Sequence, residues 1–130
     1  MNQKILLIDD DPAILDIYSA VFKQASYNYS MAINGQQGLE KATSEKPDLI
    51  LLDIMLPDVS GLDILTKLKG NAETASIPVW MLTNLGNAEI QIKAQGLGAS
   101  DFLAKAQNTP KQVIEKINNF FGASPDGSTA

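Results

Sequence analysis

Short apolar runs alternate with segments of helical spacing along most of the chain, and this alternation limits the possible folds more than any other feature. The apolar runs occupy 5–8, 49–52, 77–82 and 102–104, with a weaker mixed run at 27–33. Runs of this length suit strands that are buried on both faces. Between them, apolar residues recur three or four positions apart, as in Ile14, Tyr18 and Phe22. The alternation predicts an α/β fold with a parallel sheet, helices on both faces and right-handed crossovers.

Proline and glycine positions predict where the helices begin and end. Asp11-Pro12 and Thr109-Pro110 have the form of a helix N-cap followed by a proline in the first turn. Glycines stand where helices should stop, at Gly70, at Gly96 or Gly98, and at Gly122. No apolar pattern continues beyond that point. We therefore expect one domain over 1–121 and a flexible tail or linker stub over 122–130.

The composition excludes several classes of function. Ten basic against fifteen acidic side chains give a net charge of -5, whereas a nucleic acid or anionic membrane partner requires a basic face. We therefore expect no direct binding of nucleic acid and no membrane association. Cysteine and histidine are both absent, which removes disulfides, Cys-based metal sites and the commonest general base. The first apolar run is too short for a signal sequence or a membrane span, so we expect a cytoplasmic protein.

Polar side chains follow four of the expected strands. They are Asp9 and Asp10 after the first strand, Asp53 after the third, Thr83 after the fourth and Lys105 after the fifth. Ligands of open α/β sheets bind at the carboxyl ends of the strands. In a doubly wound sheet of order 2-1-3-4-5 the first and third strands are neighbours, so the three carboxylates should converge, with the hydroxyl and the amine beside them. Carboxylates gathered in this way favour a bound cation.

Each of these residues alone has a simpler structural explanation. An Asp after a strand is often a turn or cap residue. Thr83 could cap a helix, and Lys105 alone would be a solvated surface lysine. Phe102 is most simply a core residue, as is Trp80, which should face the layer opposite Thr83. Only the coincidence of all the polar residues at one edge of the sheet indicates a functional site.

The same residues resemble the motifs of a known family. The matching segments are Ile8-Asp9-Asp10, Asp53-Ile-Met-Leu-Pro57 with Gly61, Met81-Leu-Thr83, and Gly98-Ala-Ser-Asp-Phe-Leu-Ala-Lys105. In this order and spacing the chain resembles the CheY-like receiver domain of two-component response regulators, from residue 4 to about residue 121. The resemblance implies a flavodoxin-like fold, a doubly wound sheet of five parallel strands in the order 2-1-3-4-5.

The resemblance also implies a Mg²⁺ site. Asp10 and Asp53 would bind the metal directly, Asp9 through a water molecule, and Met55 through its backbone carbonyl. Mg²⁺ takes oxygen ligands and keeps several of its waters, so one or two carboxylates and a carbonyl are sufficient.

The implied chemistry is the transfer of a phosphoryl group to Asp53. An Asp carboxylate is already ionised at neutral pH, so this nucleophile needs charge neutralisation more than a general base. Lys105 and the hydroxyl of Thr83 would contact the phosphoryl oxygens. Phe102 occupies a position that the family often uses as an aromatic switch, and Thr83 would bias that switch.

The implied function is a phospho-accepting signalling switch rather than a turnover enzyme. A histidine kinase or a histidine phosphotransfer protein would supply the phosphoryl group, and water would later remove it. The output would be contact with a downstream protein effector, from a monomer or a weak dimer that depends on phosphorylation.

Four positions depart from the family's pattern or adjust it. Ala106 replaces the usual Pro after Lys105, so a cis peptide bond is not expected there, because non-Pro cis bonds cost about 2.5 to 4 kcal/mol. Asn84 stands where a small residue is common, which would alter access to the phosphoryl group. Met55 and Leu85 are both apolar and imply slow hydrolysis of the phosphorylated form.

Three other classes remain open to test. A haloacid-dehalogenase-like phosphatase also uses an Asp nucleophile with Mg²⁺, but its Asp-x-Asp motif would require an acid at Met55. A flavodoxin-like FMN binder needs a phosphate-cradling loop after the first strand, where this chain has three carboxylates. A degenerate receiver that acts only by protein interaction would lack one of the site residues, and none is missing.

Overall fold

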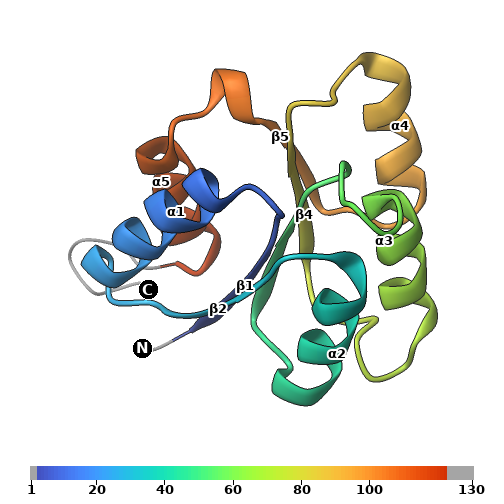
Figure 1. The fold of residues 1–130 in the computed structure, drawn as a ribbon, viewed down its shortest axis with the longest axis horizontal. Helices are drawn as coiled ribbons and strands as arrows, with labels where there is room; N and C mark the ends of the chain where they lie inside the picture. Colours follow the sequence, from blue (N-terminus) through green and yellow to red (C-terminus); the bar gives the residue numbers. More distant parts are fainter. Residues whose placement is uncertain (1–2, 123–130) are drawn as a thin grey trace.

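Five parallel strands form one sheet in the order β2-β1-β3-β4-β5 (Figure 1). The structure is a computed structural model, and it describes residues 3–122. The strands are β1 (Lys4–Ile8), β2 (Asn28–Ala32), β3 (Leu49–Leu52), β4 (Val79–Thr83) and β5 (Asp101–Ala104). The predicted doubly wound sheet and its strand order are therefore confirmed. The tail predicted over 122–130 lies outside the described residues from residue 123 onward.

Helices cover both faces of the sheet. They are α1 (Pro12–Gln24), α2 (Gly35–Glu45), α3 (Gly61–Gly70), α4 (Ala88–Gly96) and α5 (Pro110–Phe120). In Figure 1, α1 and α5 lie on one side of the sheet, and α2, α3 and α4 lie on the other. A short 3-10 helix, Lys105–Gln107, connects β5 with α5. Within residues 3–122, no helix is both long enough and apolar enough to cross a membrane.

The two faces of the sheet give two separate core layers because side chains alternate along each strand. Ile5 and Leu7 pack with α1 and α5, whereas Leu6 and Ile8 pack with the helices of the other face. Trp80 is buried in the layer under α1 and α5, where it meets Phe120 edge-on at 5.3 Å between ring centroids. The prediction that Trp80 is a core residue is confirmed.

The predicted helix starts are confirmed in atomic detail. The side chain of Asp11 caps α1 by accepting a hydrogen bond from the backbone N–H of Ala13 at 2.9 Å. Thr109 caps α5, and the side chain of Gln112 bonds back to the backbone N–H of Thr109 at 2.9 Å, which completes a capping box. The expected stops also hold, since α3 ends at Gly70 and α4 at Gly96.

The fourth strand differs from the prediction at both ends. It begins at Val79 rather than Ile77, because Pro78 has no N–H to donate within a sheet. It includes Thr83 as its last residue, so this hydroxyl is held by the sheet itself and not by a loop. Asn87, not Thr83, caps α4 by accepting from the N–H of Ile90 at 2.8 Å. Thr83 is thus left without a capping role.

Candidate functional site

Three carboxylates meet where β1 and β3 end. The two strands are neighbours, with Ile8 paired to Leu52, so the residues that follow them emerge side by side. Carboxylate oxygens of Asp9, Asp10 and Asp53 all lie within 4.8 Å of one another. Asp9 and Asp53 are buried, whereas Asp10 is exposed. The arrangement therefore has a closed inner side and an open, acidic outer side.

Lys105 supplies the positive charge on the inner side of this cluster. Its ammonium lies 2.6 Å from Oδ2 of Asp9 and 3.0 Å from Oδ2 of Asp53, and only 12% of its side chain is exposed. Burial alone would lower the pKa of this amine, but the hydrogen bonds to both carboxylates and their negative charges raise it above its usual value. The lysine therefore remains a cation that bridges β1 and β3 from the end of β5.

Asp9 is held by a second contact and influences its surroundings. Its Oδ1 accepts a hydrogen bond from the backbone N–H of Asp11 at 3.0 Å. Burial raises the pKa of the Asp9 carboxyl, and the hydrogen bonds from Lys105 and from the Asp11 backbone oppose that rise only in part. Burial, together with the charge of Asp9, also raises the pKa of Tyr18 to about 12. The Tyr18 phenol therefore stays protonated at neutral pH and offers the site no base.

The loop after β3 passes close beneath Asp53. The N–H of Met55 donates to Oδ1 of Asp53 at 3.2 Å, and the N–H of Gly61 donates to the carbonyl of Ile54 at 2.7 Å. A Cβ at position 61 would lie 2.0 Å from the backbone carbonyl oxygen of Asp53. Glycine is therefore required here by close approach of the backbone, which gives a physical reason for Gly61 in the motif.

Asp58, which the sequence analysis missed, ties the same loop to α2. Its Oδ1 and Oδ2 accept from the backbone N–H groups of Gly35 and Gln36 at 2.8 and 3.0 Å. These hydrogen bonds, with that of Gly35 the larger cause, lower the pKa of the Asp58 carboxyl. No local sequence pattern could have identified this role, because the partners lie more than twenty residues earlier in the chain.

Thr83 and Phe102 lie on the same face of the sheet. Met81 pairs with Phe102, and paired residues of parallel strands point to the same side, as does Thr83 two positions after Met81. Thr83 is buried, and its Oγ1 accepts from the N–H of Leu85 at 3.1 Å. Phe102 is half-buried against the core layer under α3 and α4. It also lines a hollow of about 400 Å³ formed with the loop before α4 and the loop after β5.

The loop after Lys105 has the geometry expected for a chain without proline at position 106. All peptide bonds among the described residues, Lys105–Ala106 included, are trans. The 3-10 helix Lys105–Gln107 follows directly, and the side-chain amide of Asn108 donates to the carbonyl of Ala104 at 2.9 Å. Asn108 was not predicted from the sequence either, although Asn is a frequent turn residue and this one stands three positions after Lys105.

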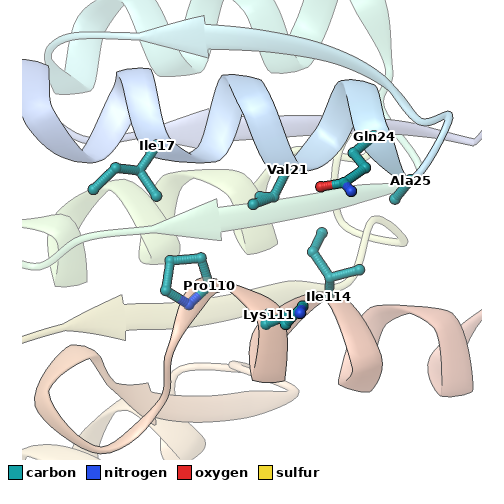
Figure 2. Close-up of a pocket in the computed structure, with 7 residues that line it drawn as sticks. All are labelled: Ile17, Val21, Gln24, Ala25, Pro110, Lys111 and Ile114. Carbon is teal, nitrogen blue, oxygen red and sulfur yellow. The ribbon is translucent and has the colours of Figure 1, made fainter.

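An apolar groove of about 390 Å³ runs between α1 and α5. Figure 2 shows its lining side chains facing one another across the groove, namely Ile17, Val21, Gln24 and Ala25 from α1 and its cap, and Pro110, Lys111 and Ile114 from α5. Ile17 is 46% exposed. The groove runs from Ile17 and Pro110, near the starts of the two helices, to Gln24 and Ala25 at the far end of α1, so only its Ile17–Pro110 end lies toward the acidic cluster.

The donors of this site fit a hard divalent cation and an anionic group beside it. The acidic cluster offers only oxygen atoms, the ligand type that Mg²⁺ and Ca²⁺ prefer, and Asp10 leaves its outer side open to water. Lys105 and Thr83 bring an ammonium and a hydroxyl to the same edge of the sheet. The arrangement is suited to nucleophilic attack by a carboxylate on a phosphoryl group.

Comparison with known proteins gives a consistent picture. The family model for the response regulator receiver domain matches residues 5–118. The DNA-binding dual master transcriptional regulator RpaA of Synechocystis sp. is 44% identical over 102 residues, which cover 78% of this chain and 42% of that protein. Sporulation initiation phosphotransferase F of Bacillus subtilis is 37% identical over 105 residues, covering 81% of this chain and 83% of that protein.

A solved structure agrees with these matches. The receiver domain protein (CheY-like) from Methanospirillum hungatei JF-1 superimposes with a TM-score of 0.85 and 29% identity, covering 92% of this chain and 94% of that one. The chain spans about half the length of several curated regulators that it matches.

Proposed function

The chain belongs to the response regulator receiver domain family, and from this premise we propose that Asp53 is its phosphoryl acceptor. Receiver domains of this family are phospho-accepting switches of two-component signalling. The observation that supports Asp53 is its position, buried at the sheet edge with two further carboxylates and in contact with Lys105 at 3.0 Å. An Asp-x-Asp phosphatase has no support, because Met55 stands where its second carboxylate would be.

In the proposed reaction, a carboxylate oxygen of Asp53 attacks the phosphorus of the donor, and the bond from phosphorus to the leaving group breaks. The ammonium of Lys105 offsets the negative charge on the phosphoryl oxygens. The hydroxyl of Thr83 donates to one of them after transfer. Water later cleaves the acyl phosphate, so the chain undergoes a cycle of self-modification and does not turn over a separate substrate.

We propose Mg²⁺ as the cofactor, held directly by Asp10 and Asp53, through water by Asp9, and by the backbone carbonyl of Met55. The oxygen-only donor set and the open side at Asp10 support this choice. When bound, Mg²⁺ supplies positive charge that offsets the charge of the phosphoryl oxygens. The hydrogen bond from Met55 to Asp53 and the tie from Asp58 to α2 hold the loop that carries the Met55 carbonyl.

We further propose that the phosphoryl donor is a histidine kinase or a histidine phosphotransfer protein and that a protein effector receives the signal, in the cytoplasm. DNA binding is named for RpaA, a longer protein. The net charge of -5 favours a protein effector for this chain over direct contact with nucleic acid. Retardation of a DNA duplex by the purified chain in an electrophoretic mobility-shift assay at physiological salt would contradict the protein-effector assignment.

We also propose that the chain is a monomer that associates at most weakly, and then only when phosphorylated.

The first prediction concerns the acceptor. Incubation with acetyl phosphate and Mg²⁺ should add one phosphoryl group, which alkali removes as it does from acyl phosphates, and Asp53→Asn should abolish the addition. Intact-mass measurement reads out both proteins. Asp11→Asn is the matched control, because it changes a neighbouring acid that caps α1 and Asn is an equally good cap. Full labelling of the Asp53→Asn protein would place the nucleophile at another residue.

The second prediction concerns the metal. Millimolar Mg²⁺ should raise the melting temperature, because a ligand that binds only the native state stabilises it by mass action. At a tenfold excess over the dissociation constant the gain is about 1.4 kcal/mol, or roughly 5 °C for a domain of this size. Chelation should reverse the gain, and Asp10→Asn should remove most of it. An Asp10→Asn protein with the full magnesium response would show that the cation binds elsewhere.

The third prediction concerns docking of the phosphodonor protein, which we assign to the α1–α5 groove. With a histidine kinase that labels the wild-type chain, the Ile17→Lys protein should be phosphorylated about tenfold more slowly, because a charge replaces apolar contact area. Labelling by acetyl phosphate, which needs no docking, should be unchanged. Ile92→Lys is the control, since Ile92 on α4 is 67% exposed and lies away from the groove. Equal losses in the two variants, or with both donors, would contradict this docking site.

The fourth prediction concerns how phosphorylation is transmitted. We propose that Thr83, drawn toward the phosphoryl group, vacates volume that Phe102 fills, which is possible because both lie on one face and Phe102 borders a hollow. Beryllofluoride should then shift amide NMR signals over residues 83–105. Thr83→Ala should keep phosphorylation but lose the distant part of the shifts, whereas Thr83→Ser, which retains the hydroxyl, should preserve it. Full-range shifts in the Thr83→Ala protein would exclude this route.

A further inference from the structure

Lys105 is the cation of the site, and its backbone lies at the start of a short loop on the edge strand. We propose that Asn108 is a positioning residue that fixes the backbone of Lys105, so that the ammonium reaches Asp9 and Asp53. The inference rests on the proposed function in one respect, since it concerns the lysine assigned to the phosphoryl oxygens. It adds to that function a residue that touches neither the acceptor nor the metal ligands.

The hydrogen bond from Asn108 acts on the peptide group that leads into Lys105. The side-chain amide nitrogen of Asn108 donates to the carbonyl oxygen of Ala104 at 2.9 Å, in a partly buried position. A peptide group is planar, so the carbonyl of Ala104 and the N–H of Lys105 turn together. Fixing the orientation of this carbonyl therefore fixes the positions of the Lys105 nitrogen and Cα, and leaves only rotation about the bond between them to set the direction of the side chain.

The rest of the loop offers little to hold that direction. Lys105–Gln107 is a single turn of 3-10 helix with no side-chain cap, and such turns have poorer hydrogen-bond geometry than α-helices. Ala106 and Gln107 are exposed and contribute little packing. At the far end, the capping box of Thr109 and Gln112 fixes the start of α5. The hydrogen bond from Asn108 to Ala104 thus connects the two ends of the turn between β5 and α5.

The lysine depends on this support because its contacts are distant from its backbone. Its ammonium stands at the end of a flexible four-carbon stem, yet must lie 2.6 Å from one carboxylate and 3.0 Å from another. A small rotation at the Lys105 Cα is amplified along the stem. Loss of the Asn108 hydrogen bond should therefore weaken both contacts without removing any group from the acidic cluster.

Amine acylation of Lys105 tests the inference without relying on phosphotransfer. A small amine-reactive ester is added to the native protein, and mass spectrometry follows modification of Lys105 against Lys111 and Lys116 of α5 as internal references. Asn108→Ala should raise the relative rate at Lys105 about three- to tenfold, the range expected from one hydrogen bond. Gln107→Ala, in the same turn, is the matched control and should leave the rate unchanged.

Asn108→Asp separates positioning from stability. It keeps the shape of the side chain but removes the donor, while a negative charge near the start of α5 favours the helix. Asn108→Asp should therefore raise the acylation rate at Lys105 as Asn108→Ala does, and it should not lower the melting temperature. Wild-type acylation rates in both Asn108 variants would overturn the inference, and so would an equal rise in the Gln107→Ala protein.

Phosphorylation by acetyl phosphate supplies a second, independent measurement. Asn108→Ala should slow labelling in the wild-type background with Mg²⁺ affinity unchanged, and should slow it no further in a Lys105→Ala background. An additive loss in the double variant would overturn the positioning role. If Lys105→Ala labels at the wild-type rate, the proposed function of the lysine fails, but the acylation rates still decide whether Asn108 positions it.

Discussion

The ammonium of Lys105, shared between the buried carboxylates of Asp9 and Asp53, is the contact on which the rest of the site depends. Two carboxylates taken out of water side by side repel each other and lose hydration, and an unpaired buried charge is strongly destabilising. The strand order solves this problem geometrically. β1 and β3 are central neighbours, so their terminal acids converge, while β5 at the sheet edge has room to send a long side chain across. A shorter or uncharged residue at 105 would leave two acids without a cation.

The structure holds Asp53, the proposed acceptor, firmly and holds the α4–β5 side of the domain more loosely. Around Asp53, the loop is fixed by backbone hydrogen bonds, by the close approach of Gly61 and by the tie from Asp58 to α2. By contrast, α4 contributes only Ala94 to the buried core and exposes Ile92. Elements with few buried apolar contacts are those that reorganise at low cost. Under the proposed function, phosphorylation of Asp53 can therefore reorganise the α4–β5 side without displacing the acidic cluster.

Features encoded locally could be predicted from the sequence, whereas those that depend on contacts between distant segments could not. Strand and helix alternation, the Asp11 and Thr109 caps and the gathering of polar residues at one edge all follow from periodicity and from the position of each residue along its element. Asp58 was missed because its partners at the start of α2 are remote in sequence. The local sequence around Lys105 is the same whether its ammonium is solvated or paired, so only the distances in the structure show that it contacts both Asp9 and Asp53. Pro78 shortened the fourth strand through its missing N–H, a local effect that the apolar run concealed.

Under the proposed function, the charge balance of the cluster links metal binding to the phosphorylation state of Asp53. Three carboxylates against one ammonium leave an excess of negative charge at the point where an anionic donor must approach. Under the proposed function, phosphorylation of Asp53 adds further negative charge and draws Lys105 toward the phosphoryl oxygens, so that Asp9 loses part of its neutralisation. A divalent cation offsets both effects. Coupling between two ligands is reciprocal, so the factor by which the cation favours the phosphorylated form is the factor by which phosphorylation tightens the cation. Under the proposed function, metal binding and phosphorylation therefore form one coupled equilibrium, in which the Asp9 carboxylate contributes both to holding the cation and to pairing with Lys105.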